Sequence, residues 1–449
     1  MKLIIRNAWI CPYQNGTIQP FFGSLTIENG KIVAFQKNDF NQFTLQTQAP
    51  HSGDSGTAII DAQGKVVTVP LINFHDHFYS RLAKGLPIAG PMDNFVNILK
   101  TLWWKLDRLL DTEMVKACAR VGAMDSIKQG VTYIFDHHAS PEATPGSLPA
   151  IAEVLREFNL RGTVCFETSD RNGEVLRNQA LQENLNFLSH YSDNHIKGMI
   201  GLHAPFTLHD ETLRQAADIQ QKTGAGIHIH VAEDAYDVQD SLENYGFPPV
   251  ERLRQFGLLS PNSILVHGVH LTEKDYSVLR QSGAALAYNP DSNLNNAVGI
   301  PSYRHVPDSI PVLVGTDGMH ANIARSHKQL FLLYRHQGNS FDEAFNWFVK
   351  IYRDEQTFVR QYFPDFPALQ VGDRADLVIW DYVPPTPFHS DNFWGHYIYG
   401  ILESPAHTVI QEGRILLQSG KLLVEYYPNV LESIREQGYR LYQKFATTE

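Results

Sequence analysis

The sequence has few cysteines, no long apolar run and no excess of positive charge. Cys11, Cys118 and Cys165 lie far apart without a Cys-x-x-Cys pair, which argues against a disulfide framework or a cysteine metal site and favours a reducing, cytoplasmic setting. No window of about 18 residues is continuously apolar, and the first residues turn polar too early for a signal peptide, so we expect no membrane contact. Lysine and arginine total 37 against 48 acidic residues. This negative balance argues against a nucleic-acid partner and leaves small molecules as the expected partners.

Two β-rich ends enclose a middle part in which short apolar runs alternate with longer helical stretches. Such alternation predicts repeated βα units, and eight candidate strands predict an α/β fold with a (β/α)8 TIM barrel. We expect the barrel at 66–368, and a small β-sandwich domain assembled from 1–65 and 369–449, the latter with a terminal helix. Within it, the aromatic segment 384–399 suits either a lid or a subunit contact. The expected strands are Val66–Val69, Val131–Phe135, Thr163–Phe166, Met199–Leu202, Ile227–Val231, Ile264–Val266, Ala284–Tyr288 and Val312–Val314.

The abundant residue is histidine, with 20 in the chain, and two His-x-His pairs have informative positions. His75 and His77 follow the first expected strand, whereas His228 and His230 lie within the fifth. Barrel enzymes build their chemistry at the carboxyl ends of the strands. Of the second pair, only the residue nearer that end is expected to bind metal, which favours His230 over His228.

Three more polar residues end expected strands. His203 ends the fourth strand, His267 the sixth and Asp317 the eighth. Neutral imidazoles with one carboxylate suit Zn²⁺ or Fe²⁺ with an open position for water. Glu233, three residues after His230, can reach over that water without binding the ion, which suits a general acid or proton shuttle.

Together these positions resemble the amidohydrolase superfamily and, within it, the mononuclear deaminase-like branch. The shared pattern is His-x-His on strand one, His-x-x-Glu on strand five, His on strand six and Thr-Asp-Gly on strand eight. Longer stretches resemble more narrowly the aminohydrolases called SsnA, a group associated by context with selenium metabolism and anaerobic purine breakdown. These stretches include Asn73-Phe-His-Asp-His-Phe-Tyr-Ser, Asp136-His-His-Ala-Ser-Pro and Asp291-Ser-Asn-Leu-Asn-Asn-Ala-Val-Gly.

The resemblance implies a role for each matched residue. Glu233 would protonate the substrate nitrogen, His267 would hydrogen-bond the attacking water or the developing oxyanion, and His203 would face the substrate. No lysine ends the fourth strand, where binuclear members keep a carboxylated lysine, so one divalent ion per chain, zinc or iron(II), is implied. Homodimers are common in the superfamily. The implied ligands are His75, His77, His230 and Asp317, of which Asp317 would also take a proton from the water.

The expected function is that of a metal-dependent aminohydrolase. Metal-activated hydroxide would attack a C–N bond of a purine-like or pyrimidine-like heterocycle, and ammonia would leave. Because His-x-x-Glu also occurs in enzymes that open cyclic amides or lactams, ring-opening hydrolysis by the same site is the alternative. A catalytically silent barrel acting as a scaffold is disfavoured, since the four ligand positions and both Glu233 and His267 are present.

Three other groups of residues have a simpler structural interpretation. Adjacent His137 and His138 point to opposite faces of a strand, so at most one can face the pocket. We interpret Trp103 and Trp104, in a helix between the first two strands, as packing residues rather than as an aromatic clamp for a flat heterocycle. Residues 291–293 favour a turn whose side chains bond their own backbone.

Overall fold

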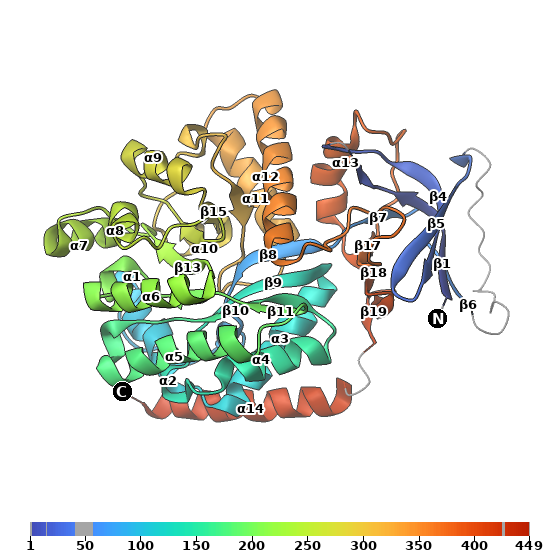
Figure 1. Ribbon diagram of the computed structural model, residues 1–449. Helices are drawn as coiled ribbons and strands as arrows, with labels where there is room; N and C mark the ends of the chain where they lie inside the picture. The colour runs from blue at the N-terminus through green and yellow to red at the C-terminus, as the bar shows by residue number, and fades with distance from the viewer. Residues whose placement is uncertain (1, 15, 41–56, 424–426, 449) are drawn as a thin grey trace. The chain divides into compact units, whose positions relative to one another are not determined.

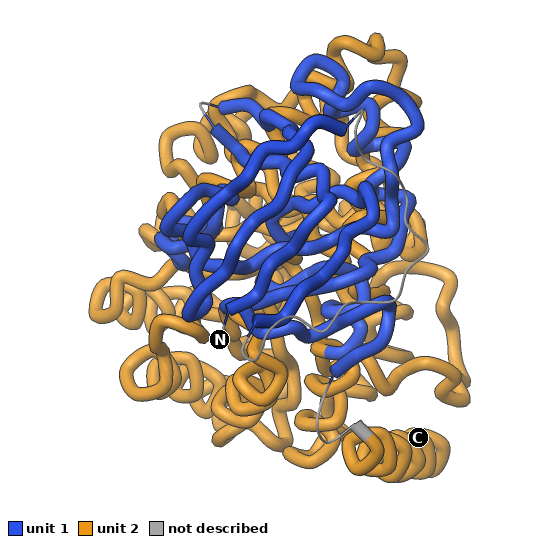
Figure 2. The backbone as a smooth tube through the Cα atoms, turned by 90° about the vertical axis from the view of Figure 1, so that its right-hand side faces the viewer, with its two compact units in different colours: residues 1–72, 124–133, 359–425 blue, residues 73–123, 134–358, 426–449 orange. Residues whose placement is uncertain are grey.

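The computed structural model describes residues 2–14, 16–40, 57–423 and 427–448, which divide into two compact units (Figure 2). Unit 1 comprises residues 1–72, 124–133 and 359–425, and unit 2 comprises 73–123, 134–358 and 426–449. The terminal helix α14 (Tyr427–Thr447) belongs to unit 2, whereas the sequence placed it with the C-terminal β segment. The compact units therefore do not divide the chain at the boundaries expected for the domains.

Unit 1 is built on one nine-stranded sheet to which both ends of the chain contribute. Its central strand β7 (Val66–Thr68) pairs parallel with β1 (Lys2–Ile10) and antiparallel with β17 (Leu377–Trp380). This pairing confirms the expected composite β domain. Hydrogen bonds join nine of its strands into one sheet, while β2 (Tyr13–Gln14) and β3 (Thr17–Ile18) pair separately. The other strands of the sheet are β4 (Phe21–Glu28), β5 (Lys31–Lys37), β6 (Thr57–Asp61), β18 (Ala406–Gln411), β19 (Arg414–Gln418) and β20 (Lys421–Leu422).

The first barrel strand is β8 (Leu71–Asp76), so the prediction of Val66–Val69 for this strand was wrong. Pro70 separates β7 from β8, and because proline has no amide hydrogen it interrupts the ladder between two apolar runs. The hydrophobic pattern alone does not reveal which of two neighbouring strands joins which sheet. As a consequence, His75 lies within the strand, and His77 is the residue that follows it.

Unit 2 contains a barrel of strands with helices outside it, which confirms the expected (β/α)8 class (Figure 1). Two parallel bridges, Thr168 with Leu202 and Asp76 with Asp317, connect its two runs of strands into a ring. The second bridge sets the end of the first strand beside the loop that follows the last. The second and third barrel strands are β9 (Val131–His138) and β10 (Arg161–Phe166). The fourth consists of two segments on either side of Met199, β11 (Ile196–Gly198), which pairs with β10, and β12 (Ile200–Leu202), which pairs with the fifth strand. The fifth to eighth strands are β13 (Ile227–Val231), β14 (Ile264–His267), β15 (Ala285–Tyr288) and β16 (Val312–Val314).

The barrel strands are buried along their whole length except at Lys197 in β11, which is why most of them read as apolar runs rather than alternating ones. None of the described helices is long and apolar enough to cross a membrane. At one end of unit 2, α14 lies beside α2 (Trp104–Leu109), where Lys444 Nζ donates to the Leu109 carbonyl at 3.1 Å. The other main helices are α3 (Thr112–Lys128), α4 (Ser147–Glu157), α5 (Glu174–His190), α6 (Asp210–Thr223), α7 (Ala235–Tyr245), α8 (Pro249–Gln255), α9 (Glu273–Ser282), α10 (Pro290–Asn295), α11 (Ile323–His336) and α12 (Phe341–Tyr362) of unit 2, and α13 (Phe393–Tyr399) of unit 1.

Candidate active site

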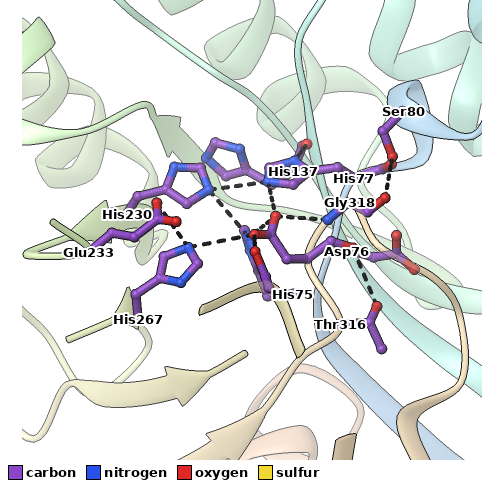
Figure 3. A network of polar contacts seen from close by, with 12 residues as sticks. His75, Asp76, His77, Ser80, His137, His230, Glu233, His267, Thr316 and Gly318 are labelled. Carbon is purple, nitrogen blue, oxygen red and sulfur yellow. Dashed lines mark hydrogen bonds and ion pairs between the residues drawn. The ribbon is translucent and has the colours of Figure 1, made fainter. Parts of the chain in front are cut away.

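The four residues expected to bind metal come together at the carboxyl ends of three barrel strands. Figure 3 shows the three histidines of this group, His75, His77 and His230. His75 and His77 are delivered by β8, His230 by β13, and Asp317 by the loop after β16. Nε2 of His230 lies 3.2 Å from Nε2 of both His75 and His77. Oδ1 of Asp317 lies 2.9 Å from Nε2 of His77 and 3.5 Å from Nε2 of His75. Four ligands at about 2 Å from a tetrahedral ion stand roughly 3.3 Å apart, so the spacing suits such an ion.

The hydrogen bonds of the three imidazoles direct their Nε2 atoms to one point. In each ring Nδ1 has a partner, and because a carbonyl oxygen only accepts, the proton of His77 and His230 is assigned to Nδ1. Nε2 is then the ring atom left to bind a cation, the usual arrangement of metal-binding histidine. The Nδ1 partners are His228 Nε2 for His75 at 2.9 Å, the His137 carbonyl for His77 at 2.6 Å and the His203 carbonyl for His230 at 2.8 Å.

The charges of the cluster also fit a cation. Burial lowers the pKa of His75 to about 3 and holds the pKa of His230 well below its usual value, so both rings are neutral. Burial alone would raise the pKa of Asp317, but hydrogen bonds from His75 and His77 hold it well below its usual range. Burial likewise opposes a charge on His77, yet the hydrogen bond and negative charge of Asp317 raise its pKa to about 9. The raised pKa of His77 and the lowered pKa of Asp317 mean that the cluster stabilises a positive charge at the point where these two side chains meet.

Three residues beside the site have left-handed backbone conformations. The φ angles are +55° at Asp317, +73° at His267 and +49° at Ala232, a region that non-glycine residues enter rarely. Each such conformation costs on the order of 1 kcal/mol and persists only where the surrounding structure enforces it. Because all three residues follow or end barrel strands, the sharp turns aim Asp317 and His267 into the site.

Glu233 and His267 lie next to the ligand cluster and face each other. Nε2 of His267 is 3.4 Å from Oε2 of Glu233 and 3.8 Å from Oδ2 of Asp317, while its Nδ1 is 3.3 Å from Oδ1 of Asn293. Burial raises the pKa of Glu233, and the interaction with the neighbouring His267 imidazole opposes that rise. A raised pKa lets a carboxyl group keep its proton to higher pH, which suits a general acid.

Two residues that touch the site were not predicted as part of it. Oγ of Ser292 donates to Oδ2 of Asp317 at 2.6 Å, and Nδ2 of Asn296 donates to Oε1 of Glu233 at 3.3 Å. Both belong to the segment around α10, so the expected turn at 291–293 is instead a short helix whose side chains hold both carboxylates. The sequence feature that could have identified these two residues is their position after the seventh strand, on the same rim as the ligands.

A pocket of about 800 Å³, open solvent at its mouth included, lies over the cluster. His203 lines this pocket, with its Nδ1 held by the hydroxyl of Thr207 at 2.7 Å. Trp103 and Trp104 also line the pocket besides packing against their helix neighbours, so the packing interpretation was incomplete. They lie where a π-helical turn (Leu99–Trp103) joins α1 (Phe95–Ile98) to α2, and such turns are frequent at functional sites.

A second group of possible ligands consists of His137, Glu167 and His230. His137 lies inside the barrel, with Nε2 at 3.1 Å from the carbonyls of Leu202 and His228, whereas His138 bonds Ser140. The adjacent histidines thus have different surroundings, as expected from their alternation along β9. His230 has one free ring nitrogen, and that atom already faces the first cluster, so this group is not an independent metal site.

Comparison with known proteins identifies the family. The sequence profile described as "Amidohydrolase family" matches residues 66–348, more than half of the chain. The chain belongs to the amidohydrolase family. It is 25% identical over 450 residues to the 5-methylthioadenosine/S-adenosylhomocysteine deaminase of Desulforudis audaxviator, covering 98% of this chain and 99% of the relative. It is 27% identical over 440 residues to the 5'-deoxyadenosine deaminase of Methanobrevibacter smithii, covering 92% and 93%.

The fold of this amidohydrolase also matches a solved deaminase. A crystal structure of an adenosine deaminase from Xanthomonas campestris with bound zinc superimposes with a TM-score of 0.77 at 19% identity, covering 98% of each chain. The comparisons confirm the superfamily resemblance and the expected class of activity, metal-dependent hydrolysis of carbon–nitrogen bonds. They also support a divalent metal as the cofactor. The narrower likeness to SsnA stays a prediction.

Proposed function

We propose that this amidohydrolase removes the amino group from the purine ring of an adenosine-type nucleoside, with one zinc ion per chain. The observation that carries the proposal is the convergence of three free imidazole nitrogens and Asp317 beside an acid, Glu233, at the floor of a pocket. The relatives are named for the deamination of methylthioadenosine or S-adenosylhomocysteine and of 5'-deoxyadenosine, which supports a purine nucleoside as the substrate. Three free, buried cysteines support a cytoplasmic location, and the homodimer stays a prediction.

The proposed ligands are His75, His77, His230 and Asp317. When bound, the ion supplies a hydroxide nucleophile at neutral pH by lowering the pKa of water from about 16 to about 7. Oδ2 of Asp317, oriented by the Ser292 hydroxyl, is placed to receive a proton from the attacking water.

On the other side of the reacting carbon, Glu233 delivers a proton to the ring nitrogen, with its carboxyl group oriented by Asn296. His267 holds the attacking water through Nε2 or, once protonated, donates to the charged oxygen, an interaction typically worth a few kcal/mol. Asn293 keeps the His267 ring in place through Nδ1. His203 contacts the substrate from the wall of the pocket. As the tetrahedral intermediate collapses, Asp317 passes the proton it received to the amine, which leaves as ammonia, and the hydroxyl proton of the intermediate returns to Glu233.

The proposal predicts ammonia release from adenosine-type nucleosides. Zinc-loaded protein is assayed with 5'-deoxyadenosine, methylthioadenosine, adenosine, guanine and cytosine, and both ammonia and ultraviolet spectra are recorded. We expect about one ammonia per substrate consumed, with the spectrum changing from an adenine to a hypoxanthine chromophore. Loss of the ring chromophore without ammonia would instead establish ring-opening hydrolysis, and no reaction with any nucleoside would refute the proposal.

A further inference from the structure

The residue between His75 and His77 is a buried aspartate that stands outside the ligand group. The side chain of Asp76 has no exposed surface. Its Oδ1 accepts a hydrogen bond from Nη2 of Arg81, and its Oδ2 accepts one from Nδ2 of Asn73 at 2.9 Å. Burial raises the pKa of Asp76, and the Arg81 guanidinium, which stays charged in proteins, opposes that rise. The carboxylate between the two proposed ligands thus holds Arg81.

Arg81 joins this strand end to the loop that follows Asp317. Its side chain is 1% exposed, and its guanidinium reaches two carbonyl groups of the loop. Nη1 donates to the Gly318 carbonyl at 3.4 Å, and Nη2 donates to the His320 carbonyl at 3.2 Å. The Gly318 carbonyl also lies 2.9 Å from Oγ of Ser80 (Figure 3). Two side chains that follow the second histidine therefore hold the backbone just after Asp317.

Gly318 also contacts the Asp317 carboxylate directly. The amide of Gly318 donates to Oδ1 of Asp317 at 2.8 Å, and Oδ1 is the oxygen that lies 2.9 Å from Nε2 of His77. The other oxygen, Oδ2, is bonded by the Ser292 hydroxyl and lies 3.8 Å from Nε2 of His267. The two oxygens of one carboxylate thus have different neighbours. Whatever holds the carbonyl of Gly318 therefore helps to orient Oδ1 toward the ligand group.

The turn at Asp317 is held at both of its ends. The amides of Thr316 and Asp317 donate to the His75 carbonyl at 2.9 and 3.0 Å, which anchors the backbone that enters the turn. Asp317 then takes its left-handed conformation, which persists only where the surrounding structure enforces it. The contacts of Arg81 lie on the side where the backbone leaves the turn.

We infer that Arg81, held by Asp76, is a positioning residue that acts through Gly318 to keep Oδ1 of Asp317 directed at the ligand group. The inference rests on the proposed function and adds a residue to its metal site. Arginine suits this role because its planar fork donates in fixed directions to a carboxylate and two carbonyls at once, whereas the ammonium of lysine is a compact point charge. Loss of such an outer contact typically lowers metal affinity or activity about 10- to 100-fold.

Arg81→Lys tests this role, because it keeps a positive charge beside Asp76 but removes the fork of donors. Zinc-loaded protein is mixed with an excess of a chromogenic chelator, and the rate of zinc release is followed. The visible spectrum of cobalt(II)-substituted protein reports the geometry of the ligands. We expect zinc release at least about tenfold faster than in the unchanged protein, together with an altered cobalt spectrum. For 5'-deoxyadenosine, kcat should fall while KM changes little.

Arg177→Lys is the matched control. Arg177 is another largely buried arginine, 3.3 Å from Oδ1 of Asp170, and neither of these residues lines the pocket. This variant should keep the zinc release rate, the cobalt spectrum and the kcat of the unchanged protein. If Arg81→Lys does not fold, the double variant Arg81→Gln with Asp76→Asn, which removes both buried charges together, is measured in the same way with the same expected result.

The outcomes separate the inference from the proposed function. A zinc release rate and a cobalt spectrum equal to those of the unchanged protein, in Arg81→Lys or in the double variant, would overturn the inference and leave the deaminase proposal intact. An unchanged protein that binds no zinc and releases no ammonia would refute the proposed function, and the inference with it.

Discussion

Replacing His230 with alanine is expected to empty the metal site and abolish ammonia release. The change removes one of three convergent Nε2 atoms, which lies 3.2 Å from both other imidazoles. If zinc binding contributes about 12 kcal/mol over four ligands, the loss of one costs about 3 kcal/mol. An energy of that size weakens affinity by more than about a hundredfold. Elemental analysis after dialysis against a weak chelator, with the ammonia assay on the same sample, measures both effects.

His336→Ala is the matched control for that variant. His336 is exposed at the end of α11, far in the sequence from the ligands, and should keep both metal and activity. Thermal unfolding with the metal removed should be similar for the unchanged protein and the control. Retention of a full equivalent of zinc by His230→Ala would contradict the ligand assignment.

Replacing Glu233 with glutamine is expected to lower kcat about a thousandfold without loss of metal, because general acid catalysis contributes roughly 10² to 10⁴ in rate. Glutamine has the same shape and can still accept the hydrogen bond of Asn296, but it cannot deliver a proton. KM should change little, since the side chain keeps its volume in the pocket wall. Steady-state kinetics and zinc content measured on one preparation separate the chemical step from metal binding.

The same change at an exposed position of the next helix, Glu243→Gln on α7, is the control for this variant. It should keep kcat and zinc content. A Glu233→Gln variant that deaminates within about tenfold of the unchanged protein would exclude Glu233 as the general acid. A variant that loses zinc would show instead that the carboxylate supports the ligand cluster.

The sequence placed each candidate ligand at or just after the end of an expected strand, and the structure brings these residues together; their role as metal ligands stays a prediction. His230, His267 and Asp317 each end a strand or follow one, and the carboxyl ends of barrel strands converge on one rim. Alternation puts His228 and His230 on the same face of the strand, and His230 was chosen because it lies nearer the carboxyl end. In the structure, Nε2 of His228 instead contacts Nδ1 of His75. Positions that depend on strand order and direction were therefore predictable.

What the sequence did not predict depends on local backbone geometry. The apolar runs on either side of Pro70 are alike in composition, so the pattern could not assign Val66–Thr68 to the sheet of unit 1. Trp104 and Asp107 reach the pocket wall through a helix with a π-helical turn, a feature without a clear sequence signal. The pairing of Asp107 with Arg171 joins a helix to a loop 64 residues later, and only the folded chain shows that contact.

The most direct test of one zinc ion acting with Glu233 in a deaminase site is a metal titration of the metal-free protein. Zinc is added in small steps, and the rate of ammonia release from 5'-deoxyadenosine is measured at each step. The account predicts no rate at the start, a linear rise, and a plateau at one equivalent of zinc per chain. Full activity without metal, or a rise that continues to two equivalents, would contradict it.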